Sequence, residues 1–404
     1  MTLLQTLFPL SESQRELNAR KTVVVGMSGG VDSSVTALIV KHLGFRTIGV
    51  FMKNWEGSEE ECSAEADWKD ARRVAGQLDI PVYSVNFSSE YAQEVFSHFL
   101  AEYKKGHTPN PDILCNREIK FKVFLDYVEK LGADMLATGH YCQTTEGKLL
   151  KGADPLKDQS YFLHAIKTSA LKKTLFPLGH LTKKVVRSLA LEANLVTKNK
   201  KDSTGICFIG ERDFKTFLSQ YIESSKGDFV NLEGTILGRH DGACFYTLGQ
   251  RKGLGVGGPG EPWFVVKKNL ECNQVVLAQG EFHPALYSDG LNATEETWIA
   301  EAPPMPVRCK AKIRYRQTDV DCVVYREEGK LKVRFDVPQR AITPRQSVVF
   351  YEGEVCLGGA MIEGALESYF ALGLSLPVGL GSNPLHSPEP AEATALEGRS
   401  LDFI

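Results

Sequence analysis

The sequence lacks several patterns that would assign it to a common class of protein. No run of residues approaches the roughly 20 apolar positions of a membrane-spanning helix. The nine cysteines are too dilute among 404 residues for a disulfide scaffold, and no two of them form a C-x-x-C pair. A zinc ribbon and a compact iron–sulfur site are therefore not expected. The formal net charge of −3 is nearly neutral, so any RNA contact would need local basic patches.

The first residues do not predict a secretory signal peptide. The first residues, MTLLQTLFPLSESQRELNARK, carry two glutamates and no long apolar run followed by a cleavage site. We therefore expect a cytoplasmic protein without a membrane segment. In such a reducing compartment a cysteine of interest is more often catalytic than bridged.

The length and the 43% hydrophobic content are sufficient for two or three domains. Between residues 22 and 140 short apolar strands alternate with amphipathic helices, a pattern that predicts an α/β fold with a parallel sheet and helices on both faces. Later segments are glycine-rich and then strand-rich. We expect an α/β domain with a helical insertion, a central β-rich linker domain, a C-terminal β-barrel and a tail of disorder-like composition, at 1–217, 218–290, 291–366 and 367–404.

In the segment VVVGMSGGVDSS, residues 23–34, an expected apolar strand is followed closely by a glycine pair. It is neither a G-x-x-x-x-G-K-[ST] loop nor a G-x-G-x-x-G loop, so the usual kinase, GTPase and dinucleotide sites are not indicated. Glycines let backbone N–H groups face an anion, and the following helix points its positive end at it. Asp32 is placed to help hold Mg²⁺ on phosphates. The structural alternative is a glycine-rich strand-to-helix turn with a serine cap.

The string S-G-G-x-D-S at residues 28–33 resembles the phosphate loop of the PP-loop ATP pyrophosphatases. That resemblance implies that ATP is cleaved between its α and β phosphates. The AMP part would then activate a substrate oxygen as a leaving group.

Two cysteines stand in unusual surroundings. In GHTPNPDILCNREIKF, prolines flank Asn110 and are expected to hold the backbone extended, and Cys115 precedes a helix expected from Glu118. The positive end of that helix would favour a thiolate, and Asp112 could act as an acid or a base. Cys207 lies in the apolar run ICFI. The alternative for each cysteine is a buried structural role.

A basic pattern appears in RCKAKIRYR, residues 308–316, where every even position is Lys or Arg. If the whole segment is one strand, all five charges lie on one face. Their repulsion would be relieved by an anionic partner such as RNA. The alternative is a solvated face whose charges are balanced by TDVDC and EEG on neighbouring strands.

Five strings occur together and in order: SGGVDSS, NPDILCN, KDQSYFL, DSTGICFIGER and FYTLGQRKGLGVGG. Over residues 20–365 they resemble the bacterial tRNA-specific 2-thiouridylases of the PP-loop superfamily. The resemblance implies a tRNA uridine 2-sulfurtransferase that uses ATP and Mg²⁺ to adenylate O2 of uridine 34 in lysine, glutamate and glutamine tRNAs. A persulfide sulfur then replaces that oxygen, and AMP and pyrophosphate are released.

The same resemblance implies roles for individual residues. Cys207 would carry the persulfide and Cys115 would be its partner nucleophile, with a disulfide between them at the end of the cycle. Asp112 would be the acid or base. The implied ATP site comprises Gly26, Met27, Ser28, Gly29, Gly30, Val31, Asp32, Ser33, Met52 and Gly139. The implied tRNA contacts are Asn110, Pro111, Asp112, His140, Lys157, Asp158, Gln159, Arg314, Tyr315 and Gln346.

The family implies a sulfur donor, either a relay protein that carries persulfide or a cysteine desulfurase, and we expect a monomer. Other classes remain as alternatives. A 2-thiocytidine synthetase of the same superfamily would need paired C-x-x-C cysteines, and an amidotransferase-type ligase would not need the two cysteines. A non-catalytic RNA-binding module would not need the phosphate loop.

Overall fold

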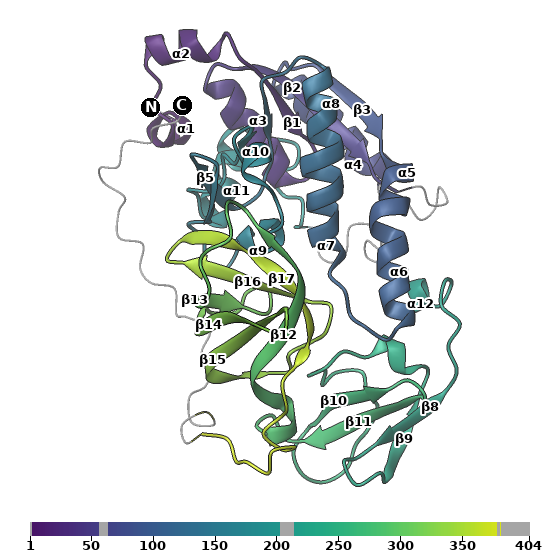
Figure 1. The fold of residues 1–404 in the computed structure, drawn as a ribbon. Helices are drawn as coiled ribbons and strands as arrows, with labels where there is room; N and C mark the ends of the chain where they lie inside the picture. Colours follow the sequence, from purple (N-terminus) through teal and green to yellow (C-terminus); the bar gives the residue numbers. More distant parts are fainter. Residues whose placement is uncertain (1, 56–63, 203–213, 378–379, 381–404) are drawn as a thin grey trace.

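The computed structural model describes residues 2–55, 64–202, 214–377 and 380. Figure 1 shows three parts that follow one another along the chain: a helix-covered parallel sheet, a small central sheet and a barrel. The expected fold class is confirmed. No helix within the described ranges is long and apolar enough to cross a membrane.

The first part is built on a five-stranded parallel sheet with the strand order β3-β2-β1-β4-β7. Its strands are β1 (Thr22–Gly26), β2 (Arg46–Lys53), β3 (Val82–Asn86), β4 (Met135–Ala137) and β7 (Thr174–Leu175). The first four correspond to the strands predicted from the sequence. The edge strand β7 was not predicted, because two residues carry no readable periodicity.

Helices cover both faces of this sheet. The helices of the described residues are α1 (Leu3–Leu7), α2 (Glu12–Asn18), α3 (Val31–His42), α4 (Ala64–Gln77), α5 (Ser88–Tyr91), α6 (Ser97–Lys104), α7 (Pro111–Leu114), α8 (Phe124–Lys130), α9 (Ser160–Leu163), α10 (Thr168–Leu171), α11 (Lys183–Glu192) and α12 (Phe214–Leu218). Two π-helical segments, Ala92–Phe96 and Cys115–Val123, join α5 to α6 and α7 to α8.

The central strand shows why these residues form a two-sided sheet. Val23, Val24 and Val25 are all fully buried. Val23 and Val25 pack in the same core as α3, α4 and α11, whereas Val24 packs on the opposite side with α6 and α8. A strand with both faces buried reads as a continuous apolar run, as this one does.

The central part is a four-stranded sheet with the order β10-β11-β8-β9. Its strands are β8 (Gly227–Val230), β9 (Ile236–His240), β10 (Trp263–Asn269) and β11 (Gln274–Gln279). The short 3₁₀ turns Ala243–Phe245 and Pro284–Leu286 precede β10 and follow β11.

The last part is a closed six-stranded barrel. Its strands are β12 (Tyr287–Trp298), β13 (Val307–Lys312), β14 (Val320–Glu327), β15 (Lys330–Arg340), β16 (Ser347–Glu352) and β17 (Val355–Ala365). β12 pairs with both β15 and β17, so the ring closes. Closure removes the exposed edge strands that would otherwise pair with other chains.

A hairpin from the first part extends this barrel sheet. β5 (Cys142–Thr145) and β6 (Lys148–Lys151) pair with each other, and β6 also pairs with β17. The hairpin follows His140 directly, so the backbone that leaves the parallel sheet is tied to the barrel. The sequence did not indicate the pairing of β6 with β17, because the paired residues are more than 200 positions apart in the chain.

The prediction that residues 308–316 form one basic strand is wrong beyond Lys312. β13 ends there, and Arg316 has a left-handed backbone with a φ of 64°. Inside the strand the charges are paired: Arg308 with Asp336, Lys310 with Asp321 at 3.1 Å, and Lys312 with Asp158 at 3.3 Å and with Asp319 at 3.6 Å. Two of these carboxylates come from TDVDC, as the alternative expected, and none comes from EEG.

Candidate active site

The predicted phosphate loop lies at the carboxyl edge of the sheet, between β1 and α3. Gly29 has a φ of 73°, and a Cβ there would lie 2.3 Å from the carbonyl oxygen of Asp67 in α4. Gly30 is the N-cap of α3 and has an extended backbone. The Ser33 hydroxyl accepts from the Ser28 amide at 3.1 Å and donates to the Gly30 carbonyl at 3.1 Å. The loop is therefore closed on itself, with its backbone amides at the start of the helix.

The other predicted adenosine positions lie on the neighbouring strands. Met52 is near the end of β2, and its Cε lies 4.0 Å from where a Gly26 Cβ would be. Gly139 follows β4, and a Cβ there would be 3.1 Å from the Ser33 amide nitrogen. Because β2, β1 and β4 are adjacent and parallel, their ends meet at one edge. The structure thus brings Gly26, Met52 and Gly139 together with the loop.

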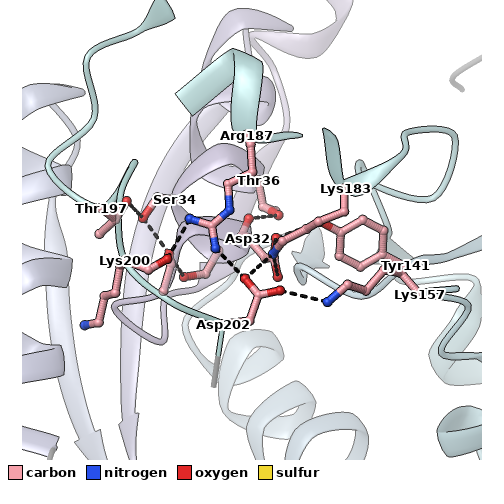
Figure 2. Close-up of polar contacts among 12 residues, drawn as sticks. Asp32, Ser34, Thr36, Tyr141, Lys157, Lys183, Arg187, Thr197, Lys200 and Asp202 are labelled. Carbon is pink, nitrogen blue, oxygen red and sulfur yellow. Dashed lines mark hydrogen bonds and ion pairs between the residues drawn. The ribbon is translucent and has the colours of Figure 1, made fainter. Parts of the chain in front are cut away.

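Asp32 is the acidic residue of this loop and is already engaged. Its carboxylate accepts from the Lys183 ammonium at 2.7 and 2.8 Å and from the Tyr141 hydroxyl at 2.7 Å. Lys183 starts α11, where Thr182 is the N-cap. Figure 2 shows Lys183 lying between Asp32 and Asp202.

Asp202 is surrounded by cations. Lys157, Lys183 and Arg187 contact its carboxylate at 2.7, 2.8 and 2.6 Å. Burial raises the pKa of Asp202, but the contacts with Lys157 and Lys183 outweigh it and hold that pKa well below its usual value. The carboxylate is therefore ionised at any working pH and fixes three positive charges beside the phosphate loop.

Sequence reasoning missed Lys183, Arg187, Lys200 and Asp202. Lys200 bridges Asp67 and Asp70 of α4 at 2.7 Å each. The available signal was the basic string KNKKD and the capped helix start LTKK. Neither string follows a strand, so nothing in the sequence linked them to the loop.

The predicted cysteine helix starts earlier than expected. The chain is helical without a break from Pro111, through the π-helical segment, to Lys130, so Cys115 lies inside the helix and not before it. The Asn110 side chain caps this helix by accepting from the Asp112 amide at 3.1 Å, and Pro111 occupies the first position. Proline is favourable at that position. Pro111 therefore starts a helix, although the two prolines predicted an extended backbone.

Cys115 is 3% exposed and belongs to the core on the α8 side of the sheet. It begins the π-helical segment, a distortion that is frequent at functional sites. Cys207 and Cys62 lie outside the described residues. The pairing of Cys115 with Cys207 therefore stays a prediction.

Asp112 and His140 are both affected by Lys120. Burial raises the pKa of Asp112, and Lys120 opposes that rise. Burial, with Lys120 adding to it, lowers the pKa of His140 well below its ordinary value. His140 bonds the Thr138 hydroxyl at 2.8 Å and contacts the Phe121 ring. It is thus a buried, neutral imidazole.

The KDQ segment makes contacts inside the protein. Lys157 pairs with Asp202, as described above. Asp158 is 5% exposed and accepts from the Gly152 and Ser160 amides at 3.0 and 3.1 Å. Gln159 accepts from the Tyr141 amide at 3.0 Å. Their predicted RNA contacts stay predictions.

The barrel residues predicted to contact tRNA lie close to the first part. Arg314 is half-buried and donates to the Ala341 carbonyl at 2.5 Å. The Tyr315 ring lies 4.4 Å from the Phe162 ring. Gln346 donates to the Thr108 carbonyl at 2.5 Å. The barrel therefore holds the segment that leads into Asn110.

A buried carboxylate strengthens this junction. Glu102, at the end of α6, accepts from Arg345 of the barrel at 2.7 and 3.1 Å, from His107 at 2.7 Å and from Lys105 at 3.0 Å. Burial raises the pKa of Glu102, but these partners lower it to about 2. Arg345 also pairs with Glu295 of β12 at 2.8 Å. We call Glu102, Arg345, His107 and Lys105 the junction clamp.

Three protein families match successive parts of the chain. They are described as the tRNA methyl transferase HUP domain at residues 21–211, the tRNA methyl transferase PRC-barrel domain at 215–279 and the aminomethyltransferase beta-barrel domain at 288–362. The three matches together cover the parallel sheet, the central sheet and the barrel.

Curated relatives match almost end to end. The tRNA-specific 2-thiouridylase MnmA of Protochlamydia amoebophila is 55% identical over 366 residues, which is 89% of this chain and 97% of the relative. The MnmA of Alkaliphilus oremlandii is 56% identical over 355 residues, covering 85% and 98%. The MnmA of Listeria monocytogenes serotype 4a is 54% identical over 354 residues, covering 86% and 95%.

Solved structures resemble the chain more distantly. The U34-tRNA thiolase NcsA of Methanococcus maripaludis, with its [4Fe-4S] cluster, has a TM-score of 0.33 at 17% identity, covering 52% of this chain and 71% of that one. A 4-thiouridine synthetase–RNA complex with bound ATP has a TM-score of 0.32 at 16% identity, covering 50% and 49%.

Proposed function

Because this chain belongs to the family of the tRNA-specific 2-thiouridylase MnmA, we propose that it is a tRNA-uridine 2-sulfurtransferase that acts on uridine 34. The observation that supports this most directly is the identity of 54–56% with curated relatives over nearly their whole length. The five sequence strings fall inside that matched region. We propose lysine, glutamate and glutamine tRNAs as substrates.

The loop at Gly26–Ser33 fits a nucleotide phosphate. Asp67 leaves no room for a side chain at Gly29, and the backbone amides of such a glycine-rich loop at the start of a helix suit an anion. Lys157, Lys183 and Arg187 add three positive charges beside it. ATP held there supplies the adenylyl group that makes the uridine O2 a leaving group. Met52 and Gly139 would border the adenosine. Asp32, which already accepts from Lys183 and Tyr141, would add one carboxylate to a Mg²⁺ ion held mainly by the phosphates.

Asn110, Pro111 and Asp112 are proposed to hold the target base. They start a helix that the Asn110 side chain caps and whose first position is Pro111. Asp112 is proposed to move the proton of the uridine, because its raised pKa brings proton uptake closer to neutral pH. The target base must leave the anticodon stack to reach these residues.

Cys207 is proposed to carry the sulfur as a persulfide, and Cys115 to be its partner. Attack of the terminal sulfur on C2 of the activated uridine expels AMP, and the Cys115 thiolate then releases the sulfur by forming a disulfide with Cys207. The sulfur is proposed to come from a relay protein that carries persulfide or from a cysteine desulfurase. We propose that the chain acts on its tRNA as a monomer in the cytoplasm.

The test is to express the chain in a bacterial strain that lacks its own 2-thiouridylase, and to measure the wobble nucleoside by mass spectrometry. The unaltered chain should restore 2-thiouridine. Cys207→Ser and Cys115→Ser should not, whereas Cys272→Ser, an exposed cysteine in the central part, should restore it fully.

The same variants separate the proposal from other PP-loop reactions. Purified Cys207→Ser protein should still release pyrophosphate from ATP when tRNA is present. Restoration of 2-thiouridine by the Cys207→Ser chain would contradict the sulfur role. Failure of the unaltered, folded chain to thiolate tRNA with a persulfide donor would contradict the function itself.

A further inference from the structure

A cavity of about 290 Å³ lies where the three parts of the chain meet. One wall is the segment after α6, with Lys105, His107 and Thr108, and another is β10, with Lys267 and Lys268. The barrel contributes Thr343 and Pro344. We call this space the junction pocket. None of the residues proposed above for ATP or for the two sulfurs lines it.

The lining of the junction pocket is cationic. Lys105, His107, Lys267 and Lys268 all line it, and no Asp or Glu is among the lining residues. Lys268 is mostly buried and donates to the Tyr246 carbonyl at 2.7 Å. Burial lowers the pKa of Lys268 to about 8. Within the described ranges neither Lys267 nor Lys268 has a carboxylate partner, so both charges are available to an anion.

The nearest buried carboxylate does not oppose an anion in this pocket. Glu102 is clasped by Arg345 from the barrel, and by His107 and Lys105 from its own segment. Arg345 therefore helps to neutralise the Glu102 carboxylate, which otherwise pairs only with Lys105 and His107 of the pocket lining. The remaining excess of positive charge belongs to Lys267 and Lys268.

The pocket borders the segment proposed to bind the target base. Thr108 lines it, lies two residues before Asn110 and is held by Gln346 through its carbonyl and by Thr247 through its hydroxyl at 3.2 Å. An RNA loop with its base at Asn110 must carry its backbone across the adjacent surface. Leu248 and Leu270 form an apolar part of its wall.

We propose that the junction pocket binds a backbone phosphate of the RNA substrate, with Lys268 as its principal ligand. This inference rests on the proposed function, since it takes tRNA as the substrate. It adds a contact from the central part of the chain, whose residues the reaction has not otherwise used.

The first test measures the affinity of the full chain for unmodified tRNA as a function of salt. Lys268→Met should weaken binding roughly tenfold at low salt and reduce the slope of log K against log salt by about one. Lys226→Met removes the same charge from an exposed position in the central part and is the matched control, with wild-type affinity expected. Equal affinities of Lys268→Met and wild-type protein would overturn the proposal.

A second test uses pH and does not depend on the Met variant folding. Lys268 faces Lys105, His107, Lys267 and the Cys244 thiol. Because it loses its proton near pH 8, wild-type affinity for tRNA should fall several-fold between pH 7 and pH 8.5. Lys268→Arg keeps its charge and should bind equally at both values. The same fall in both proteins would contradict the assignment.

A third test uses inorganic phosphate to distinguish binding of an RNA phosphodiester from binding of free phosphate. If millimolar phosphate raises the melting temperature of the wild type but not of Lys268→Met, while both bind tRNA equally, the pocket takes free phosphate and the RNA assignment is wrong. If the unaltered chain fails to bind tRNA at all, the proposed function fails before this inference is reached.

Discussion

Gly29 shows how one residue can be dictated by its neighbours. Its backbone is left-handed, and an added Cβ would overlap the Asp67 carbonyl, whereas a Cβ at Gly30 would lie 3.5 Å from the Ser28 hydroxyl. The first glycine is therefore required by the close approach of α4, and the second caps a helix. The glycine pair was visible in the sequence, but the requirement for the first comes from a helix more than 30 residues away.

Asp112 provides a prediction at the scale of the residue. Its pKa is raised by burial, so a base at this position becomes active only above the usual Asp range. The rate of sulfur transfer in a single turnover should therefore rise with pH along an acidic limb. Asp112→Asn should abolish transfer. Lys120→Met removes an opposing charge and should move the limb to higher pH.

The measurement is the rate of 2-thiouridine formation between pH 5 and pH 8 with tRNA and ATP in excess. His140 shares the field of Lys120, and the loss of that charge raises the pKa of His140 too. A neutral His140→Gln variant therefore serves as the background for the comparison. An acidic limb that does not move in Lys120→Met on this background would contradict the role of Asp112.

At the scale of the element, the helix that contains Cys115 is set by its first residues. Asn110 caps it and Pro111 starts it, so a helix begins where the sequence suggested an extended turn. Because the four residues of α7 continue into the π-helical segment and α8, the cap orients a helical stretch that runs to Lys130. The orientation of Cys115 thus depends on a side chain five positions earlier.

Removing this cap should destabilise the protein. Asn110→Ala loses the side-chain oxygen that satisfies the Asp112 amide, and we expect the free energy of unfolding to fall by about 1 kcal/mol. Asn110→Asp keeps a capping oxygen and should lose much less. Urea denaturation at pH 7 measures both. Equal losses in the two variants would show that the cap does not stabilise the helix.

At the scale of the whole molecule, two of the contacts that bind the barrel to the catalytic part are a shared sheet and an ion-pair cluster. The β5–β6 hairpin adds to β17, and the junction clamp joins Arg345 to Glu102. Arg345 has a left-handed backbone, with a φ of 67°. Such a conformation is unfavourable for a side chain other than glycine, and it persists here where the guanidinium reaches two carboxylates.

The clamp predicts how stability depends on acid. The pKa of Glu102 is about 2 in the folded chain and 4.5 as an ordinary value. A lowered pKa stabilises the fold above the unfolded value, and that contribution is lost as the pH falls from about 4.5 towards 2. The loss from this group should be roughly 1–3 kcal/mol after allowance for solvent screening.

Chemical denaturation at pH 7 and at pH 3 tests this. Glu102→Gln should be less stable than the wild type at pH 7, and the difference should shrink at pH 3. Glu295→Gln removes only the more exposed partner of Arg345 and should retain the acid dependence of the wild type. A constant difference between Glu102→Gln and wild type across this range would contradict the prediction.

Local patterns were sufficient for the elements of the first part. The apolar runs that became β1 to β4 and the amphipathic helices between them follow from periodicity alone, since a two-sided sheet needs continuous burial. The phosphate loop followed from its glycines and its position between strand and helix. The order of five strings also indicated the family before any coordinates were considered.

The sequence by itself therefore determined the strand-to-helix loop at Gly29 and the α/β class of the first part, because these depend on neighbours within a few positions. Tertiary structure decided the rest. Lys183 reached Asp32 of the phosphate loop, and Arg345 reached Glu102, through contacts between residues more than 100 positions apart. Such partners are selected by the packing of distant elements, and no local period or motif records that packing.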